Sequence, residues 1–145
     1  MIAIINGPNL NLLGKRQPEI YGNECFENFL RNLRENFPDI PLEYFQSNCE
    51  GDIIDHLHKL GYESPDCEGI VINPGAYSHY SYAIADAISS IPVPVVEVHI
   101  SNIMKREDFR HQSVTGAVCK GMISGLGLQG YSLAISYLLS LPKNI

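Results

Sequence analysis

The hydrophobic positions of this chain form five short runs, separated by longer segments of mixed polarity. The runs cover residues 2–5, 42–45, 70–72, 95–98 and 118–123, and several are rich in valine and isoleucine. Strands that are covered on both faces by helices show this nearly continuous apolar sequence. The runs therefore predict five strands of a parallel sheet.

Between the runs, apolar residues recur every three or four positions, which places them on one face of an α-helix. Helices that alternate with strands are typical of βαβ units. The sequence predicts a flavodoxin-like, doubly wound α/β fold, with a five-stranded parallel sheet between two helical layers. We expect residues 1–145 to form a single domain. The apolar stripes are Phe26, Phe29, Leu30, Leu33 and Phe37; Ile53, Leu57 and Leu60; Ile84, Ala87, Ile88 and Ile91; and Tyr131, Ala134, Ile135 and Leu138.

Composition indicates which classes of partner are disfavoured and which cellular compartment is expected. The 145 residues carry a formal net charge of −6, which argues against nucleic-acid or anionic-membrane partners because both favour a basic surface. Cys25, Cys49, Cys67 and Cys119 are far apart and form no CxxC pair, as expected for free thiols in a reducing compartment. The apolar N-terminus is too short for a signal peptide, and no later run is long enough for a membrane span. We expect a cytoplasmic protein.

Polar, turn-rich segments follow three of the predicted strands. They are Asn6-Gly7-Pro8-Asn9, Asn73-Pro74-Gly75 and His99-Ile100-Ser101. In a doubly wound sheet, ligands bind beyond the carboxyl ends of the strands, where the strand order reverses. We therefore expect these segments to converge on one cleft.

Other motifs give weaker indications of function. Residues 125–130 match GxGxxG, but too little chain follows for the second βα unit of a dinucleotide fold, so close packing of a helix against the sheet is the better interpretation. No P-loop and no GxSxG sequence occurs. The histidines lack metal-ligand spacing, since His56 and His58 are two positions apart on a predicted helix, and we expect no metal site.

Glu97 and His99 are separated by one residue on a predicted strand, so their side chains share a face. A carboxylate beside an imidazole fixes its tautomer and favours its protonated form, which can donate a proton near neutral pH. A satisfied structural pair at a strand end is an equally good interpretation of the spacing alone.

A long connection follows the first predicted strand and carries cations and a tyrosine between Gly14 and Gly22. Long connections in compact proteins are commonly functional lids. A tyrosine base must lose its proton, and lowering its pKa from about 10 to 7 costs roughly 4 kcal/mol. One guanidinium about 4 Å away supplies a comparable energy at an effective dielectric constant near 20. Arg16 could therefore activate Tyr21 if the loop brings them together; a solvated loop with a packing tyrosine is the alternative.

Together these segments resemble the type II 3-dehydroquinate dehydratases over nearly the whole chain. The resemblance rests on several separate motifs in the same order, which is more specific than any one of them. The motifs are INGPNLNLLG at 5–14, RQPEIYG at 16–22, QSN at 46–48 with EG at 50–51, NPGAYSH at 73–79, EVHISN at 97–102, Arg106 through Arg110, and GLG at 125–127 through Gly130-Tyr131.

The resemblance implies a hydro-lyase that converts 3-dehydroquinate to 3-dehydroshikimate by anti elimination of water through an enolate, with no cofactor. It implies a role in the shikimate pathway of aromatic amino-acid biosynthesis, with quinate breakdown by the same reaction as the alternative. It also implies a homo-oligomer, a dodecamer formed as a tetramer of trimers.

The resemblance implies catalytic roles for residues of the lid and of two strand ends. Tyr21 would remove a proton next to the ketone, and Arg16 would lower its pKa. Asn9 would stabilise the enolate, and His99, oriented by Glu97, would protonate the departing hydroxyl.

Further residues would bind the substrate, by the same resemblance. Asn73, Ile100 and Ser101 would hold its carboxylate, His79 and Arg110 its ring hydroxyls, and Asp86 would reach the site of a neighbouring subunit.

Three positions depart from the commoner family pattern: Gln17 replaces an acidic residue, Tyr80 a smaller one and Met104 a histidine. Two rival functions remain. A flavin- or nucleotide-binding module would share the fold, and an inactive scaffold of the same family would share fold and assembly. The presence of Arg16, Tyr21 and His99 argues against the scaffold.

Overall fold

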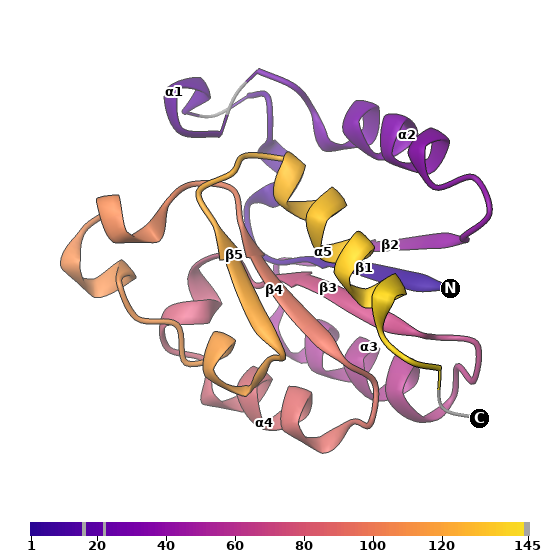
Figure 1. The fold of residues 1–145 in the computed structure, drawn as a ribbon. Coiled ribbons are helices and arrows are strands. Elements are labelled where there is room, and N and C mark those ends of the chain that lie inside the picture. The colour runs from indigo at the N-terminus through magenta and orange to yellow at the C-terminus, as the bar shows by residue number, and fades with distance from the viewer. Residues whose placement is uncertain (16, 22, 144–145) are drawn as a thin grey trace.

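The apolar runs of the sequence form one parallel sheet (Figure 1). The structure is a computed structural model that describes residues 1–15, 17–21 and 23–143, with the backbone alone at residues 18 and 21. Within these residues the sheet has five strands in the order β2-β1-β3-β4-β5, all parallel. The strands are β1 (Ile2–Asn6), β2 (Leu42–Gln46), β3 (Gly69–Asn73), β4 (Val95–His99) and β5 (Gly121–Ser124).

The fifth predicted run begins too early. Val118 ends a 3-10 turn, η5 (Gly116–Val118), and the strand starts three residues later at Gly121. Val118 is 39% exposed and Met122, within the strand, is 45% exposed. Apolar residues of this edge strand thus lie partly at the surface, and hydrophobicity alone does not mark where the strand begins.

Helices cover both faces of the sheet, as predicted from the alternation of strands and helical stripes. α2 (Phe26–Asn36) and α5 (Gln129–Ser140) pack on one face with Ile2 and Ile4 of β1. α3 (Glu50–Tyr62) and α4 (Tyr82–Ser90) pack on the other face with Ala3 and Ile5. Alternate residues of one strand thereby enter two separate cores, and each large apolar side chain that is fully buried contributes about 1.5–3 kcal/mol.

The glycine-rich segment after β5 serves packing, as predicted from the GxGxxG match. A Cβ atom at Gly130, in the first turn of α5, would lie 3.1 Å from Val98 Cγ1 and 3.4 Å from Ile123 Cγ2. The missing side chain therefore lets the start of α5 lie directly on β4 and β5.

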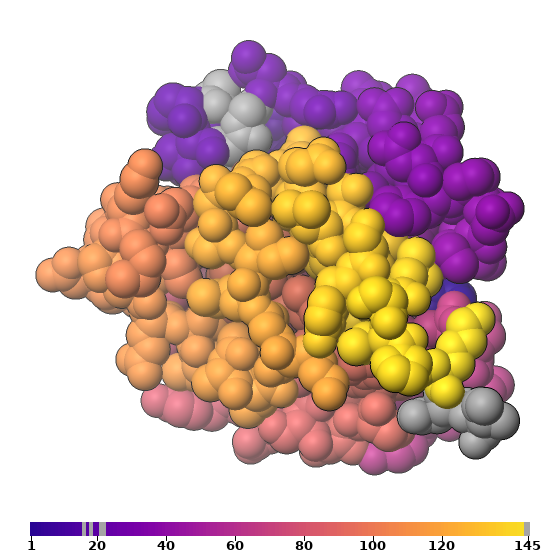
Figure 2. Space-filling view, viewed as in Figure 1, coloured from indigo at the N-terminus to yellow at the C-terminus, as the bar shows by residue number. Residues whose placement is uncertain are grey.

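The order of the strands reverses between β1 and β3, and short segments gather beyond their carboxyl ends. These are η1 (Leu10–Leu12), α1 (Pro18–Tyr21), η2 (Gly75–His79), η3 (Ile103–Lys105) and η4 (Asp108–Arg110). The segment between β4 and β5 projects from the body of the molecule in the space-filling view (Figure 2). Among the described residues, no helix combines the length and apolarity needed to cross a bilayer.

Candidate active site

A pocket lies beyond the carboxyl ends of β1, β3 and β4, with a cavity of about 100 Å³. Its lining comes from all three polar segments that follow these strands, which confirms that they converge on one cleft. The predicted site residues that line it are Asn9, Asn73, His79, His99, Ile100, Ser101 and Arg110.

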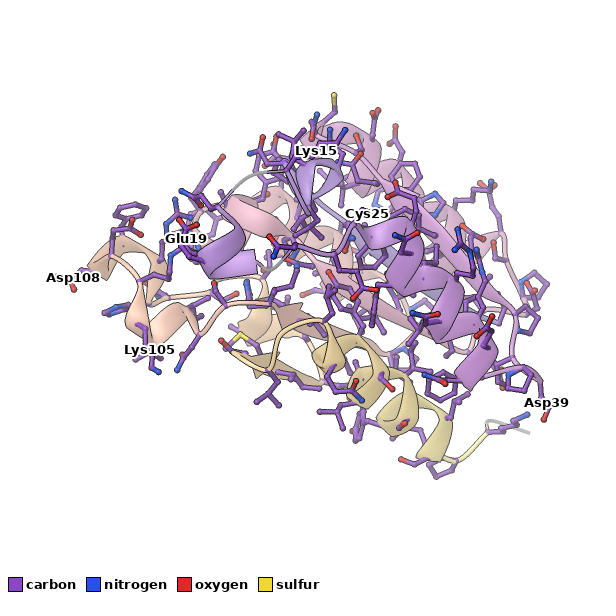
Figure 3. All side chains as sticks on the ribbon, turned by 90° about the horizontal axis from the view of Figure 1, so that it is seen from above. Lys15, Glu19, Cys25, Asp39, Lys105 and Asp108 are labelled. Atoms are coloured by element: carbon purple, nitrogen blue, oxygen red, sulfur yellow. The ribbon has the colours of Figure 1, made fainter. Side chains whose placement is uncertain are left out.

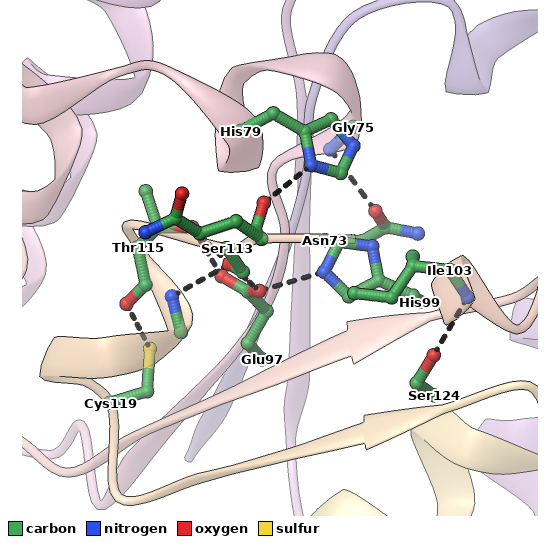
Figure 4. A network of polar contacts seen from close by, with 12 residues as sticks. Asn73, Gly75, His79, Glu97, His99, Ile103, Ser113, Thr115, Cys119 and Ser124 are labelled. Carbon is green, nitrogen blue, oxygen red and sulfur yellow. Dashed lines mark hydrogen bonds and ion pairs between the residues drawn. The ribbon is translucent and has the colours of Figure 1, made fainter. Parts of the chain in front are cut away.

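Glu97 and His99 form an ionisable pair at the end of β4 (Figure 4). Glu97 Oε2 lies 2.7 Å from His99 Nε2; Glu97 is fully buried and His99 is 6% exposed. The prediction that the two side chains lie side by side is confirmed. Because an ionised carboxylate only accepts hydrogen bonds, Nε2 carries the hydrogen and Nδ1 is the ring nitrogen left for a ligand.

Two hydroxyl groups hold the same carboxylate from the connection between β4 and β5. Thr115 Oγ1 donates to Glu97 Oε1, and Ser113 Oγ donates to Oε2 alongside His99. The N–H of Gly116 donates to Ser113 Oγ at 2.9 Å, which directs the serine hydrogen at the carboxylate. Burial of a charge is costly unless its lone pairs are used, and three donors meet that need here. The carboxylate is thereby fixed, and it holds the imidazole in one orientation.

Cys119 lies next to Thr115, and its thiol is unreactive. Its thiol donates to the carbonyl oxygen of Thr115 at 3.3 Å. Burial, with a smaller contribution from the negative charge of Glu97, raises the pKa of the thiol to about 12. The thiol stays protonated at neutral pH, and a thiol is a far weaker nucleophile than a thiolate.

His79 is the second histidine of the pocket, and its environment differs from that of His99. The ring centroids are 6.3 Å apart. His79 Nδ1 lies 2.8 Å from the carbonyl oxygen of Gln112, so Nδ1 donates and Nε2 is an acceptor in the neutral ring. Burial lowers the pKa of His79 below its ordinary value of 6.5. His79 therefore offers an acceptor to a ligand hydroxyl, whereas His99 is held by a carboxylate.

The turns after β1 and β3 interlock to form the floor of the pocket. A Cβ atom at Gly7 would lie 2.5 Å from the carbonyl oxygen of Pro74, so only glycine fits this crossing. Asn9 then adopts a left-handed conformation with φ 69°, and its N–H donates to Asn48 Oδ1 at 3.0 Å. Asparagine tolerates this conformation better than most residues. The side chain of Asn48 thus holds the Asn9 backbone in this conformation.

Basic side chains from the connection after β4 form the rim. Arg106 donates from Nη1 to Ser101 Oγ at 3.1 Å, which leaves the serine hydrogen for a ligand. Arg110 donates from Nε to Glu107 Oε2 at 2.8 Å, and its guanidinium carbon lies 5.0 Å from the centroid of the Phe109 ring. The rim therefore places positive charge beside a pocket in a protein of net charge −6.

Three further predicted site residues remain: Arg16, Tyr21 and Asp86. Arg16 lies outside the described residues, and Tyr21 ends α1 with a side chain outside the described part. Asp86 is exposed on α4 and is not among the described residues that line the pocket. Figures 1 and 3 place α1, which carries Glu19, at the same end of the molecule as the loop with Lys105 and Asp108.

Sequence reasoning missed Arg106, Ser113 and Thr115. Arg106 had a usable signal, because it follows the end of β4 by a few residues in a segment that also supplies Arg110. Ser113 and Thr115 had none, since their contact with Glu97 depends on the path of a connection that contains no regular strand or long helix.

A doubly wound sheet whose switch-point pocket holds a carboxylate-bound imidazole defines a flavodoxin-like α/β protein equipped for proton transfer. Over residues 1–139 the chain matches the model of a family described as Dehydroquinase class II, and it belongs to that family. The 3-dehydroquinate dehydratase of Thermotoga petrophila is 54% identical over 141 residues, which are 94% of this chain and 93% of that protein. The protein of the same name from Bacillus subtilis is 54% identical over 140 residues, 94% of this chain and 92% of that protein. The crystal structure of a type II dehydroquinase from Butyrivibrio crossotus matches with a TM-score of 0.91 and 51% identity, over 96% of this chain and 97% of that one.

Proposed function

We propose that this chain is a type II 3-dehydroquinate dehydratase, which converts 3-dehydroquinate to 3-dehydroshikimate by anti elimination of water. The observation that carries the proposal is the buried Glu97–His99 pair, 2.7 Å apart in the switch-point pocket of a chain from this family. The relatives from Thermotoga petrophila and Bacillus subtilis are both named 3-dehydroquinate dehydratase, which supports the same substrate.

In the proposed first step, Tyr21 removes a proton from the carbon next to the ketone, and the electron pair of the broken C–H bond forms an enolate. Arg16 keeps the Tyr21 phenol deprotonated through its charge. Asn9 stabilises the enolate oxygen through a water that it orients. Support for a lid comes from the position of α1 at the pocket end of the molecule (Figures 1 and 3).

In the proposed second step, the enolate re-forms the ketone and a carbon–carbon double bond, and the carbon–oxygen bond to the leaving hydroxyl breaks. His99 gives its proton to that hydroxyl, which departs as water. Tyr21 has gained one proton and His99 has lost one, so a proton exchange through solvent restores both. The reaction requires no cofactor, because side chains perform both proton transfers.

The proposed substrate contacts follow the polarity of the pocket. Asn73, Ile100 and Ser101 receive the carboxylate, since amide and hydroxyl donors converge there. His79 accepts from a ring hydroxyl through Nε2, and Arg110 donates to another.

Asp86 serves a neighbouring subunit in this proposal, and the assembly is a dodecamer of four trimers. Asp86 is exposed on α4 and is not among the described residues that line the pocket, which supports a role across a subunit contact. We also propose a cytoplasmic enzyme of aromatic biosynthesis. Light scattering measures the molar mass in solution and so tests the dodecamer. If deletion of the gene creates no requirement for aromatic amino acids, the biosynthetic role is contradicted.

Ultraviolet absorbance of the conjugated enone tests the reaction after 3-dehydroquinate is added to the purified protein. Tyr21→Phe and Arg16→Ala should each abolish most turnover while the assembly stays intact, and a near-normal rate in either variant contradicts its assigned role.

Borohydride added with the substrate should trap no adduct, because no lysine forms a Schiff base. A flavin spectrum in the purified protein would favour the rival function of a flavin-binding module.

A further inference from the structure

A chain of buried polar side chains runs beneath the pocket floor. Tyr131, at the start of α5, is fully buried, and its hydroxyl lies between Asn6 at the end of β1 and Asn73 at the end of β3. Asn73 Nδ2 is 3.0 Å from Tyr131 Oη, and Tyr131 Oη is 2.7 Å from Asn6 Oδ1. The two strands on either side of the switch point are therefore joined by a side chain from a distant helix.

The direction of each hydrogen bond in this chain follows from one backbone donor. The N–H of Gly75 lies 3.1 Å from Asn73 Oδ1, and since an N–H can only donate, the oxygen of the Asn73 amide must face it. The amide nitrogen of Asn73 then faces Tyr131 Oη and donates to it. The hydrogen of Tyr131 is left for Asn6 Oδ1, and burial raises the pKa of Tyr131, so this hydrogen is retained.

This directionality determines what Asn73 offers the pocket. Its oxygen is taken by Gly75 and one amide hydrogen by Tyr131, which leaves its second amide hydrogen. Asn73 lines the pocket, so it presents a donor there and suits an anionic oxygen. With the Tyr131 hydroxyl removed, Gly75 would be the remaining described partner that fixes the amide plane.

The placement of Tyr131 depends on the glycine-rich segment before it. Gly130 lets α5 approach Val98 of β4, where a Cβ atom would be 3.1 Å away. The Tyr131 ring then packs edge-on against Phe26, with ring centroids 5.1 Å apart. Aromatic packing and the close helix–sheet contact thus fix the position of the Tyr131 hydroxyl. The glycine of the GxGxxG motif therefore contributes to the structure beneath the pocket, and this contribution involves no dinucleotide.

We propose that Tyr131 is a positioning residue for substrate binding, which holds the Asn73 carboxamide so that an amide hydrogen faces the substrate carboxylate. The inference rests on the proposed function, because it assigns the carboxylate of that substrate to Asn73. Tyr131 itself does not line the pocket among the described residues, so it acts through Asn73.

The Tyr131→Phe variant tests this role. A carboxylate contact that is equal in the ground state and the transition state affects KM and leaves kcat unchanged, so we expect KM for 3-dehydroquinate to rise by about tenfold and kcat to stay within about twofold. A general loss of packing would instead reduce the folded fraction and lower the apparent kcat.

Tyr44→Phe is the matched control. Tyr44 Oη accepts from Asn6 Nδ2 at 3.4 Å, at the far end of the same chain, and its loss leaves the contact between Asn6 and Tyr131 in place. We expect an unchanged KM for this variant. A KM that rises equally in both variants overturns the proposal, because it would reflect loosening of the β1 end and not the amide of Asn73.

A double-mutant cycle separates action through Asn73 from an independent effect. In the Asn73→Ala background, Tyr131→Phe should change KM by less than about twofold, because the group that it positions is gone. Fold-changes that multiply in the double variant overturn the proposal.

Two further outcomes are informative. If Tyr131→Phe does not fold, Asn6→Ala keeps the ring and removes the acceptor of its hydroxyl, and KM should rise in the same direction; an unchanged KM there overturns the proposal. Absence of turnover in the wild-type protein overturns the proposed function together with this inference, whereas normal wild-type turnover with an unchanged KM in Tyr131→Phe overturns the inference alone.

Discussion

Two buried polar regions lie at the pocket end of the sheet, and they are built from different chemistry. At the ends of β1 and β3, Asn6, Tyr131 and Asn73 form a chain of neutral groups whose directions follow from one backbone N–H. At the end of β4, the carboxylate of Glu97 receives three donors, one of them the imidazole of His99. Neutral hydrogen bonds thus suffice to fix the direction of the Asn73 amide, whereas the imidazole proposed to transfer a proton is held by an ionisable partner.

The cost of burial is higher for the carboxylate of Glu97 than for the neutral amides of the other region. A buried amide needs only a few ordinary hydrogen bonds, and neighbouring turns and α5 supply them. A buried carboxylate costs several kcal/mol unless it is fully paired. Glu97 therefore depends on Ser113 and Thr115, which lie 16 and 18 residues further along the chain.

The largest expected effect separates the two regions directly. His99→Gln removes the proposed acid and should lower kcat by about 10²- to 10⁴-fold with little change in KM. Asn73→Ala removes a binding contact and should mainly raise KM. Steady-state kinetics with 3-dehydroquinate measure both constants; a similar fall in kcat for the two variants would break the distinction between the regions.

A smaller effect is expected when the charge of Glu97 is removed but its shape is kept. In Glu97→Gln, an NH₂ donor replaces one carboxylate oxygen, so at least one of the three partners must turn round to accept, and no negative charge remains beside the His99 imidazole. We expect kcat to fall by about 10- to 100-fold, the loss that is typical when the partner that orients a metal-bound imidazole is removed. Circular dichroism provides the control for folding. A kcat equal to that of the wild type would show that Glu97 is only a structural partner of His99.

The predictability of the two regions differs as well. The strands and the pair on β4 follow from short-range periodicity: nearly continuous apolar runs mark buried strands, and a spacing of two residues puts Glu97 and His99 on one face. The same argument was wrong at residue 118, because β5 is an edge strand with exposed apolar positions. Sequence periodicity therefore predicts strands and neighbours on one strand face, because both depend on residues that are close together in the chain.

The neutral region could not be predicted from pattern. Contact between Tyr131 and Asn6 joins residues 125 positions apart and depends on how closely α5 packs on the sheet. Tyr131 belongs to an apolar helical stripe, and that periodicity gives no sign that its hydroxyl matters. The roles of Arg16, Tyr21 and Asp86 came from family resemblance, and they remain predictions for the experiments proposed above.

The two hydroxyl groups that donate to Glu97 should differ in their effect on kcat. Thr115→Val leaves Oε1 without its described donor, whereas after Ser113→Ala the Oε2 atom keeps His99. We expect kcat to fall by about three- to tenfold in Thr115→Val and by less than about threefold in Ser113→Ala, since a lost hydrogen bond to a charged group is worth more when no other donor replaces it. Equal effects in the two variants, measured under identical conditions, would contradict the unequal support of the two oxygens.

The smallest expected effect concerns His79 and the dependence of stability on pH. Burial lowers the pKa of His79 in the folded protein below 6.5, so between these two values the unfolded chain binds a proton that the folded chain does not. The free energy of unfolding should therefore decrease as the pH falls below about 6.5. His79→Gln should flatten this part of the curve in urea denaturation at several pH values, whereas His58→Gln, at an exposed position of α3, should leave its slope unchanged. Identical slopes in the wild type and in His79→Gln would mean that His79 is not held neutral in the pocket, and the contrast between a neutral and a carboxylate-bound imidazole would then fail.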